Sequence, residues 1–421
     1  MQVLERKPVP IVVWQHVESA ASLRRTRTVL VRAPHVRLLH LRRLDDRLAA
    51  QLDGVAVAGD AGRAVAQAAL ESPGVGELFT ATANALVTQD NATLARMLAL
   101  AEALPAAMPG LLSAFGWVTP QALRGVTKAL LDAATPFARE VGLAACAMHG
   151  VSPAASLLKG AAEESPSLRA RALRYLGEAG VKDGLLPCLK ALADEDLGCR
   201  FHAARSAALL GDRQDSLAAL GALAAAPGPW QRPALLFLLR FAAPTDAHRL
   251  LQPLAQQAAQ ARLLVQAVGA GGNPHYVTWL VKQMEDPKLA RVAGESFSLI
   301  TGLDLAHLDF DVRNPPEPAN GPTEDAADEQ VALDEDESLP YPDVAKVHAW
   351  WSAHGSRFTP GARYLMGQPV DPAQCLAVLR TAFQRQRAAA AETLCLLQPG
   401  TPLFNVAAPA SRQERQLQKM S

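Results

Sequence analysis

The chain has 421 residues, a formal net charge of zero and 49% hydrophobic content, so it can bury a large core. Aromatic residues are only 5%, which favours helices packed through Ala and Leu. No apolar run reaches the length of a transmembrane helix, and we expect a cytoplasmic protein with no membrane contact.

The cysteines argue for a reducing compartment. None forms a CxxC pair, and most lie inside apolar helical stretches; they are Cys146, Cys188, Cys199, Cys375 and Cys395. This pattern is typical of small buried hydrophobic residues, and a zinc site is not expected. We expect no metal and no cofactor.

The N-terminal region, residues 1–76, is predicted to be a helical cap. A long amphipathic helix starts near residue 35 and ends near Gly54, and a second starts near Gly59. Residues 1–50 hold ten Lys/Arg against four acids. We interpret the arginines as a solvated helix face partly paired with Asp45 and Asp46, with a polyanion site as the alternative; they are Arg24, Arg25, Arg27, Arg32, Arg37, Arg42, Arg43 and Arg47.

Residues 77–305 carry an internal repeat. Six times an arginine is followed eleven positions later by a small or turn-forming residue, and successive arginines are 29 to 32 residues apart. The pairs are Arg139 with Gly150, Arg169 with Gly180, Arg200 with Gly211, Arg232 with Ala243, Arg262 with Asn273, and Arg291 with Gly302. A period near thirty made of two short helices predicts an all-α, HEAT-like solenoid of stacked helix pairs.

Within one repeat the pattern is explicit. Phe201, Ala204, Ala208 and Leu209 recur at helical spacing and predict one buried stripe. The glycines, and Asn273 in one repeat, are expected just past the helix in a left-handed conformation; Ala243 departs from this rule.

Acids precede most of the repeat arginines: Asp132, Glu164, Asp194, Asp196 and Asp286. We interpret them with the arginines as a structural ladder that caps helices and links repeats. The alternative is a row of arginines on a concave binding surface.

The charge changes sign after the repeats. Residues 309–343 contain twelve Asp/Glu against Arg313 and are rich in proline, which predicts a solvated linker over 306–343. Residues 344–421 are predicted to form a C-terminal helical cap, with one helix in 341–358 and a helix pair in 372–397.

Four segments resemble a family of bacterial HEAT-repeat proteins found in type VI secretion gene neighbourhoods. They are 41–62 (LRRLDDRLAAQLDG, then AGDAG), 294–305 (GESFSLITGLDL), 350–367 (WWSAHGSRFTPGARYLMG) and 399–404 (PGTPLF). The resemblance covers nearly the whole chain. It implies an accessory role beside a spike protein, a PAAR-like tip or a secreted toxin, and it brings no catalytic residues.

Enzyme and ligand-binding classes were weighed against the residues. No His-Glu dipeptide occurs, as a hydroxylase-like di-iron site would need, HExxH is absent, and His35 and His40 are off one helical face. We interpret His149 and His202 as partly buried structural side chains. A bilin-lyase-like groove could be lined by His202, Arg205, Trp230 and Tyr276, and a nucleic-acid-binding HEAT protein would need a basic face that the repeats lack.

We therefore expect a non-enzymatic protein-binding scaffold or adaptor that binds a secretion spike, tip or effector. An immunity protein for a toxin would show the same features. The candidate partner-binding residues are Trp350, Trp351, Arg357, Arg363 and Tyr364, because Trp, Tyr and Arg often anchor interfaces. Adjacent helical residues point about 100° apart, so one tryptophan is expected in the core and the other at the surface.

Overall fold

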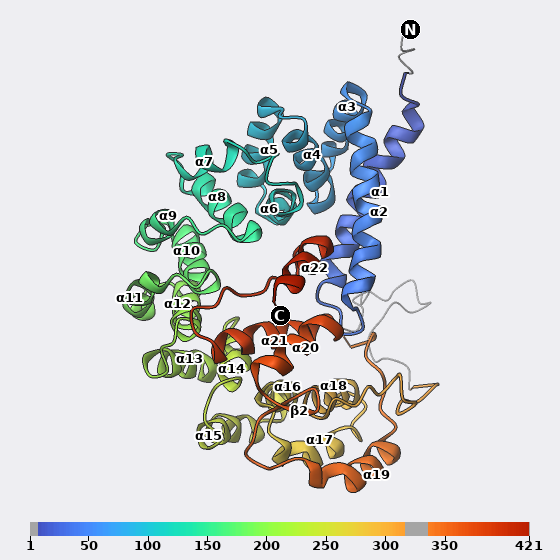
Figure 1. The fold of residues 1–421 in the computed structure, drawn as a ribbon, viewed down its shortest axis with the longest axis vertical. Coiled ribbons are helices and arrows are strands. Elements are labelled where there is room, and N and C mark those ends of the chain that lie inside the picture. Colours follow the sequence, from blue (N-terminus) through green and yellow to red (C-terminus); the bar gives the residue numbers. More distant parts are fainter. Residues whose placement is uncertain (1–6, 316–335, 421) are drawn as a thin grey trace. The chain divides into compact units, whose positions relative to one another are not determined.

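The computed structural model describes residues 7–315 and 336–420. Over these residues the fold is an all-α solenoid of helix pairs with one short antiparallel hairpin, as the repeat predicts (Figure 1). The chain divides into two units. Unit 1 comprises Met1–Arg32, Val36–Cys188 and Pro402–Ser421, and unit 2 comprises Ala33–His35 and Leu189–Thr401. This division falls inside the repeats and assigns the expected C-terminal cap to both units.

Unit 1 begins with an antiparallel helix hairpin followed by short helix pairs. Its helices are α1 (Pro10–Leu30), α2 (Leu38–Val57), α3 (Asp60–Ala68), α4 (Val75–Val87), α5 (Asn91–Ala103), α6 (Met108–Trp117), α7 (Val126–Leu131), α8 (Pro136–His149), α9 (Ala154–Gly160), α10 (Pro166–Glu178) and α22 (Ala410–Lys419), while α11 (Leu185–Lys190) spans the boundary. Helix starts follow the usual chemistry, since Asp90 and Thr135 accept bonds from backbone amides of α5 and α8.

Helix α2 runs three residues beyond the expected end at Gly54. A Cβ at Gly54 would lie 2.6 Å from the His16 ring of α1, so the glycine permits close helix packing rather than a stop. The break comes at Gly59, whose φ is +55°, and α3 starts directly after it. The second predicted helix is therefore confirmed.

Unit 2 continues the helix pairs and then folds its later segments back onto them. Its helices are α12 (Leu197–Leu209), α13 (Asp215–Ala225), α14 (Gln231–Leu239), α15 (Pro244–Ala255), α16 (Ala261–Gly271), α17 (Val277–Gln283), α18 (Ala290–Thr301), α19 (Val344–His354), α20 (Pro372–Thr381) and α21 (Gln384–Leu397), and the strands are β1 (Tyr364–Leu365) and β2 (Gln368–Pro369). The pairing places Tyr364 opposite Pro369 and Leu365 opposite Gln368.

Short 3₁₀ turns join several of the helices. They are η1 (Ala69–Glu71), η2 (Pro105–Ala107), η3 (Lys182–Gly184), η4 (Ala191–Ala193), η5 (Ala258–Gln260), η6 (Pro274–Tyr276) and η7 (Gly355–Arg357). Among the described residues no single helix is long and apolar enough to cross a membrane; α5 with the segment Pro105–Trp117 passes only as a pair bent by 116°.

The six arginine-bearing helices, α8, α10, α12, α14, α16 and α18, are called the A helices here. In α12 the expected stripe is buried, with Phe201, Ala204, Ala208 and Leu209 all at most 6% exposed. All five cysteines are also buried and reduced. Packing through Ala and Leu, as the composition predicts, therefore builds the repeat core.

The ends of the A helices follow the glycine prediction in four repeats. Positive φ angles occur at Gly150, Gly180, Gly211 and Gly302. The prediction for Asn273 is wrong, because the left-handed residue is Gly272, with φ +68°. Asn273 has an extended backbone instead, and its side chain accepts a bond from the amide of His275 at the next turn.

The acidic segment is packed at its C-terminal end, residues 336–343. Asp336 and Leu339 are buried, Val312 N donates to Tyr341 O, and Asp343 N donates to Phe310 O. The prediction of a solvated linker is therefore wrong for residues 336–343, which pack within unit 2, whereas residues 306–315 are largely exposed although main-chain bonds tie them to 341–343. Its middle, 316–335, lies outside the described residues.

Candidate interaction surface

The repeat arginines bind mainly to loop carbonyls in the first repeats. Arg139 Nη1 donates to Ala133 O and Ala134 O at 3.0 and 2.8 Å, and Arg169 Nη1 donates in the same way to Glu163 O and Glu164 O at 2.7 and 3.0 Å. The guanidinium thus closes the loop that leads into its own helix.

Carboxylates play a smaller part in the expected ladder. Arg139 reaches Glu163 of the next repeat at 2.9 Å, which does link two repeats. Asp196 instead accepts from Cys199 N, and Asp286 accepts from Lys288 N, so these acids cap backbone amides. The structural interpretation of the repeat therefore holds better for main-chain capping than for acid and arginine pairs.

In unit 2 the later repeat arginines contact neighbouring segments. Arg232 Nε donates to Gln266 of the next A helix at 2.8 Å. Arg262 pairs with Asp336, and Arg291 bonds to Leu339 O and stacks over Tyr341. Arg262 and Arg291 thus hold residues 336–341 of the acidic segment against α16 and α18. Arg200 is half-buried within α12.

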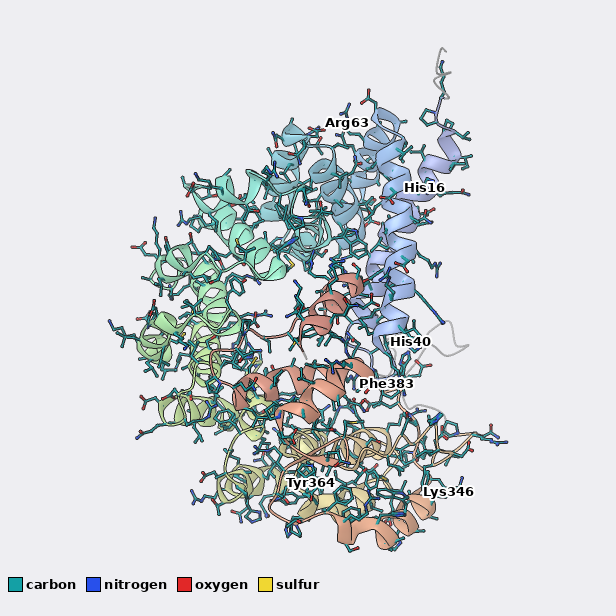
Figure 2. The ribbon with its side chains drawn as sticks, viewed as in Figure 1. His16, His40, Arg63, Lys346, Tyr364 and Phe383 are labelled. Carbon is teal, nitrogen blue, oxygen red and sulfur yellow. The ribbon has the colours of Figure 1, made fainter. Side chains whose placement is uncertain are left out.

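Two of the predicted partner-binding residues, Arg363 and Tyr364, bind the C-terminal ends of α14 and α16 within unit 2. Arg363 Nη2 donates to Leu239 O and Ala242 O, and its Nε donates to Gly271 O. Tyr364 is 7% exposed, and its amide donates to Gly272 O at 2.8 Å. Burial, helped by Arg240, lowers the pKa of Arg363 to about 10. The Arg363 side chain and the Tyr364 backbone are thus engaged at the carbonyl ends of A helices, and the Tyr364 hydroxyl accepts from Thr359 N at 3.1 Å (Tyr364 is labelled in Figure 2).

The tryptophan pair differs from its prediction. Trp350 and Trp351 are both half-buried, because the ring of Phe297 meets each of them edge-on at 5.9 and 6.5 Å. Trp351 Nε1 also donates to Thr278 at 3.2 Å. Arg357 is exposed. The five residues therefore do not form one exposed patch.

A half-buried carboxylate, Glu392, fixes α21 to the repeats of unit 2. Glu392 accepts from Arg205 Nη2 at 3.1 Å and from Arg240 Nε at 3.0 Å. Burial alone would raise the pKa of Glu392, but the two arginines hold it below its usual value. Arg205 also lies over the ring of Phe237, so this arginine serves packing within the unit.

Residues 154–239 match the family model of HEAT repeats. The match extends from α9 to α14 and contains the repeats of Arg169, Arg200 and Arg232. No curated protein matches the chain. The match thus contains three of the six arginine-bearing repeat helices.

The N-terminal arginines are not all solvated. Arg24 is buried, donates to Ser113 at 2.7 Å and lies over Phe79; burial, with Arg27, lowers its pKa to about 10. Arg27 is buried against Asp45. The prediction of a solvated face is wrong for these two arginines, although the pairing with Asp45 and Asp46 is present in Arg27 and Arg42.

The histidines considered as ligands lie in separate structural contacts. His149 Nε2 is 2.8 Å from Phe115 O, and burial lowers its pKa. His202 meets Trp230 edge-on, whereas Tyr276 bonds to His248 at 2.9 Å in another repeat. Across residues 7–315 and 336–420, no group of three His, Cys, Asp or Glu is arranged to hold a metal ion.

Sequence reasoning missed an exposed apolar group at the start of α1. Val9, Ile11, Val12 and Trp14 are 57, 59, 42 and 50% exposed, while Val13 is buried. The available signal was the unbroken run from Ile11 to Trp14, because consecutive helical residues point in all directions and cannot all face the core. Such grouping of apolar side chains on a surface is typical of an interaction site.

Proposed function

We propose that this chain is a non-enzymatic protein-binding scaffold or chaperone-like adaptor of the type VI secretion pathway, acting in the cytoplasm. HEAT repeats commonly serve as interaction scaffolds, and the match over residues 154–239 supports that general role. The secretion link is supported by the resemblance of residues 41–62 and 350–367. Its partner would be a spike protein, a PAAR-like tip or an effector.

The exposed group at the start of α1 is the observation that carries a binding role. Its four large apolar side chains occupy six consecutive positions, whereas the opposite face of α1 packs through Val13 and Val17. A protein partner would remove this surface from water, and Trp14 is of the residue type that most often dominates such contacts.

Capture from the native cytoplasm tests the proposal. Tagged wild-type chain and a variant with Ile11→Ser and Trp14→Ser would be compared by mass spectrometry of what co-purifies. We expect the wild type to enrich a spike, tip or effector and the variant to lose it, with an unchanged melting temperature because these side chains are exposed.

A matched variant at the other candidate surface, Trp350→Ala, locates the contact. Loss of the partner with Trp350→Ala alone would place binding on α19. Enrichment of a toxin, together with its neutralisation, would support the immunity role in place of the adaptor role. Absence of any secretion protein from both captures would contradict the proposal.

A further inference from the structure

Residues 402–419 return to unit 1 and dock there through main-chain atoms. Arg27 donates to Ala407 O and Ala408 O, each at 2.9 Å, and Ala410 N donates to Asp45 Oδ2 at 2.7 Å. Leu403 N donates to Glu178 O at 2.7 Å. These contacts go to backbone atoms of an extended segment that leads into a helix, and buried side chains such as Phe404 add to them.

The charged pair at the centre of this contact lies within the N-terminal hairpin of unit 1. Arg27 and Asp45 make two bonds to each other, Nε to Oδ1 at 2.7 Å and Nη2 to Oδ2 at 3.2 Å. Arg27 also lies over the ring of Trp117 at 5.7 Å. Because the two side chains neutralise each other, we expect the pair to keep its arrangement when the segment leaves, so that a second segment would find the site ordered.

The segment makes few side-chain contacts with unit 1. Only Ala410, Gln413 and Leu417 of α22 are buried, Phe404 and Ala408 are buried before it, and Arg412 Nη1 donates to Met148 O at 2.8 Å. The ion pair between Arg42 and Glu414 is more than a third exposed on both sides. Helices shorter than about 12 residues are marginal alone, so α22 with ten residues folds as it docks. Release therefore returns chain entropy at the cost of exposing these few buried side chains.

We propose that unit 1 carries a peptide-binding site centred on Arg27 and Asp45, that residues 402–419 occupy it as an internal ligand, and that a partner protein presenting an extended segment followed by a helix displaces them. The class of partner rests on the proposed protein-binding function. The site itself is tested with the chain's own sequence, so the two ideas can fail separately.

The test compares full-length wild type with Ala410→Pro. Proline suits the first position of a helix and the extended backbone of Pro409 before it, so α22 keeps its start while Asp45 loses its amide donor. A fluorescent peptide of residues 402–421 should bind the variant about ten-fold or more tightly than wild type, because the internal competitor is weakened. The same peptide carrying Ala410→Pro should bind both chains more weakly than the unmodified peptide binds the variant, because it cannot donate an amide bond to Asp45.

Hydrogen exchange of the wild-type chain gives a second measurement that needs no variant. Amides of residues 411–417 should exchange at least about ten-fold faster than those of α21, while α1 and α2 stay protected. Ser411→Ala is the control and should change neither readout. Equal peptide binding by both chains, or exchange of α22 only together with α1 and α2, would show that the segment is a permanent part of unit 1.

Discussion

Helices α21 and α22 follow one another in the chain but are held in different ways by the two units. In α21, ten of fourteen residues are buried, and Glu392 binds two arginines of unit 2. In α22, three of ten residues are buried, and unit 1 holds mainly the backbone before it and its first amide. The first is a core element, whereas the second has the character of a bound ligand.

The largest effect should come from Glu392→Ala. Removing this carboxylate leaves Arg205 and Arg240 buried together without their partner, which should destabilise unit 2 by about 3 kcal/mol or more. Urea unfolding read by hydrogen exchange in each unit measures it. Asp246→Ala, which removes an exposed pair with Arg249 in the same unit, is the control and should change stability little. A small loss at Glu392 would mean that α21 is held by its alanines and leucines alone.

Two glycines with a left-handed backbone, one in each unit, differ in the space around them. Gly150 in unit 1 has open space around it, whereas a Cβ at Gly302 in unit 2 would lie 2.6 Å from Met366 O of the hairpin. Gly150→Ala should cost about 1 kcal/mol for the left-handed backbone, and Gly302→Ala about 3 kcal/mol because the hairpin must also shift. Thermal unfolding of both variants measures the two losses of stability. Equal losses would mean that the hairpin moves aside at little cost in free energy.

A pH series separates two carboxylates that contact α21. The pKa of Glu392 is lowered in the folded state, so its stabilisation is present above the ordinary value of 4.5 and disappears as the pH falls through the folded pKa. Burial raises the pKa of Glu295 despite its bond to Arg385, so its contribution is present at low pH and disappears as the pH rises through the raised folded pKa.

Unfolding free energies from about pH 3 to about pH 7 measure the two effects. Glu392→Gln should flatten the loss of stability on the acid side. Glu295→Gln should become relatively less destabilising as the pH rises. The same pH dependence in both variants would contradict the opposite shifts.

The smallest effect is expected at Glu414→Ala on α22. Its pair with Arg42 is exposed, so the melting temperature of unit 1 should not change measurably. Exchange of residues 411–417 provides a more sensitive readout. A clear drop in melting temperature would mean that side-chain contacts hold α22 in place, as they hold α21.

The repeats could be predicted because local spacing determines them. The arginines, the glycines and the apolar stripe of α12 all lie within one period, and a helix end such as Gly211 needs no distant partner. Asn273 was misplaced by one residue because Gly271, Gly272 and Asn273 are adjacent and each can end a helix.

The contacts of the C-terminal segment could not be predicted in the same way. Arg27 donates hydrogen bonds to carbonyls that lie 380 and 381 residues later in the chain. Arg363 donates to carbonyls more than 90 residues earlier. Every residue carries a main-chain carbonyl, so the sequence does not show which carbonyl will accept a bond from a distant arginine. Residue type therefore suggested an interface for Arg363 and Tyr364, although their partners lie within unit 2.

The same long separations affect how the chain matures on the ribosome. Helix α1 emerges early, but the carbonyls that satisfy Arg27 are translated hundreds of residues afterwards. In an ordinary solenoid each new repeat completes its predecessor, so folding can advance from one end. Here residues 402–419 are made last, so we expect nascent unit 1 to lack these acceptors for most of synthesis, and during that interval the proposed site would be accessible to other polypeptides.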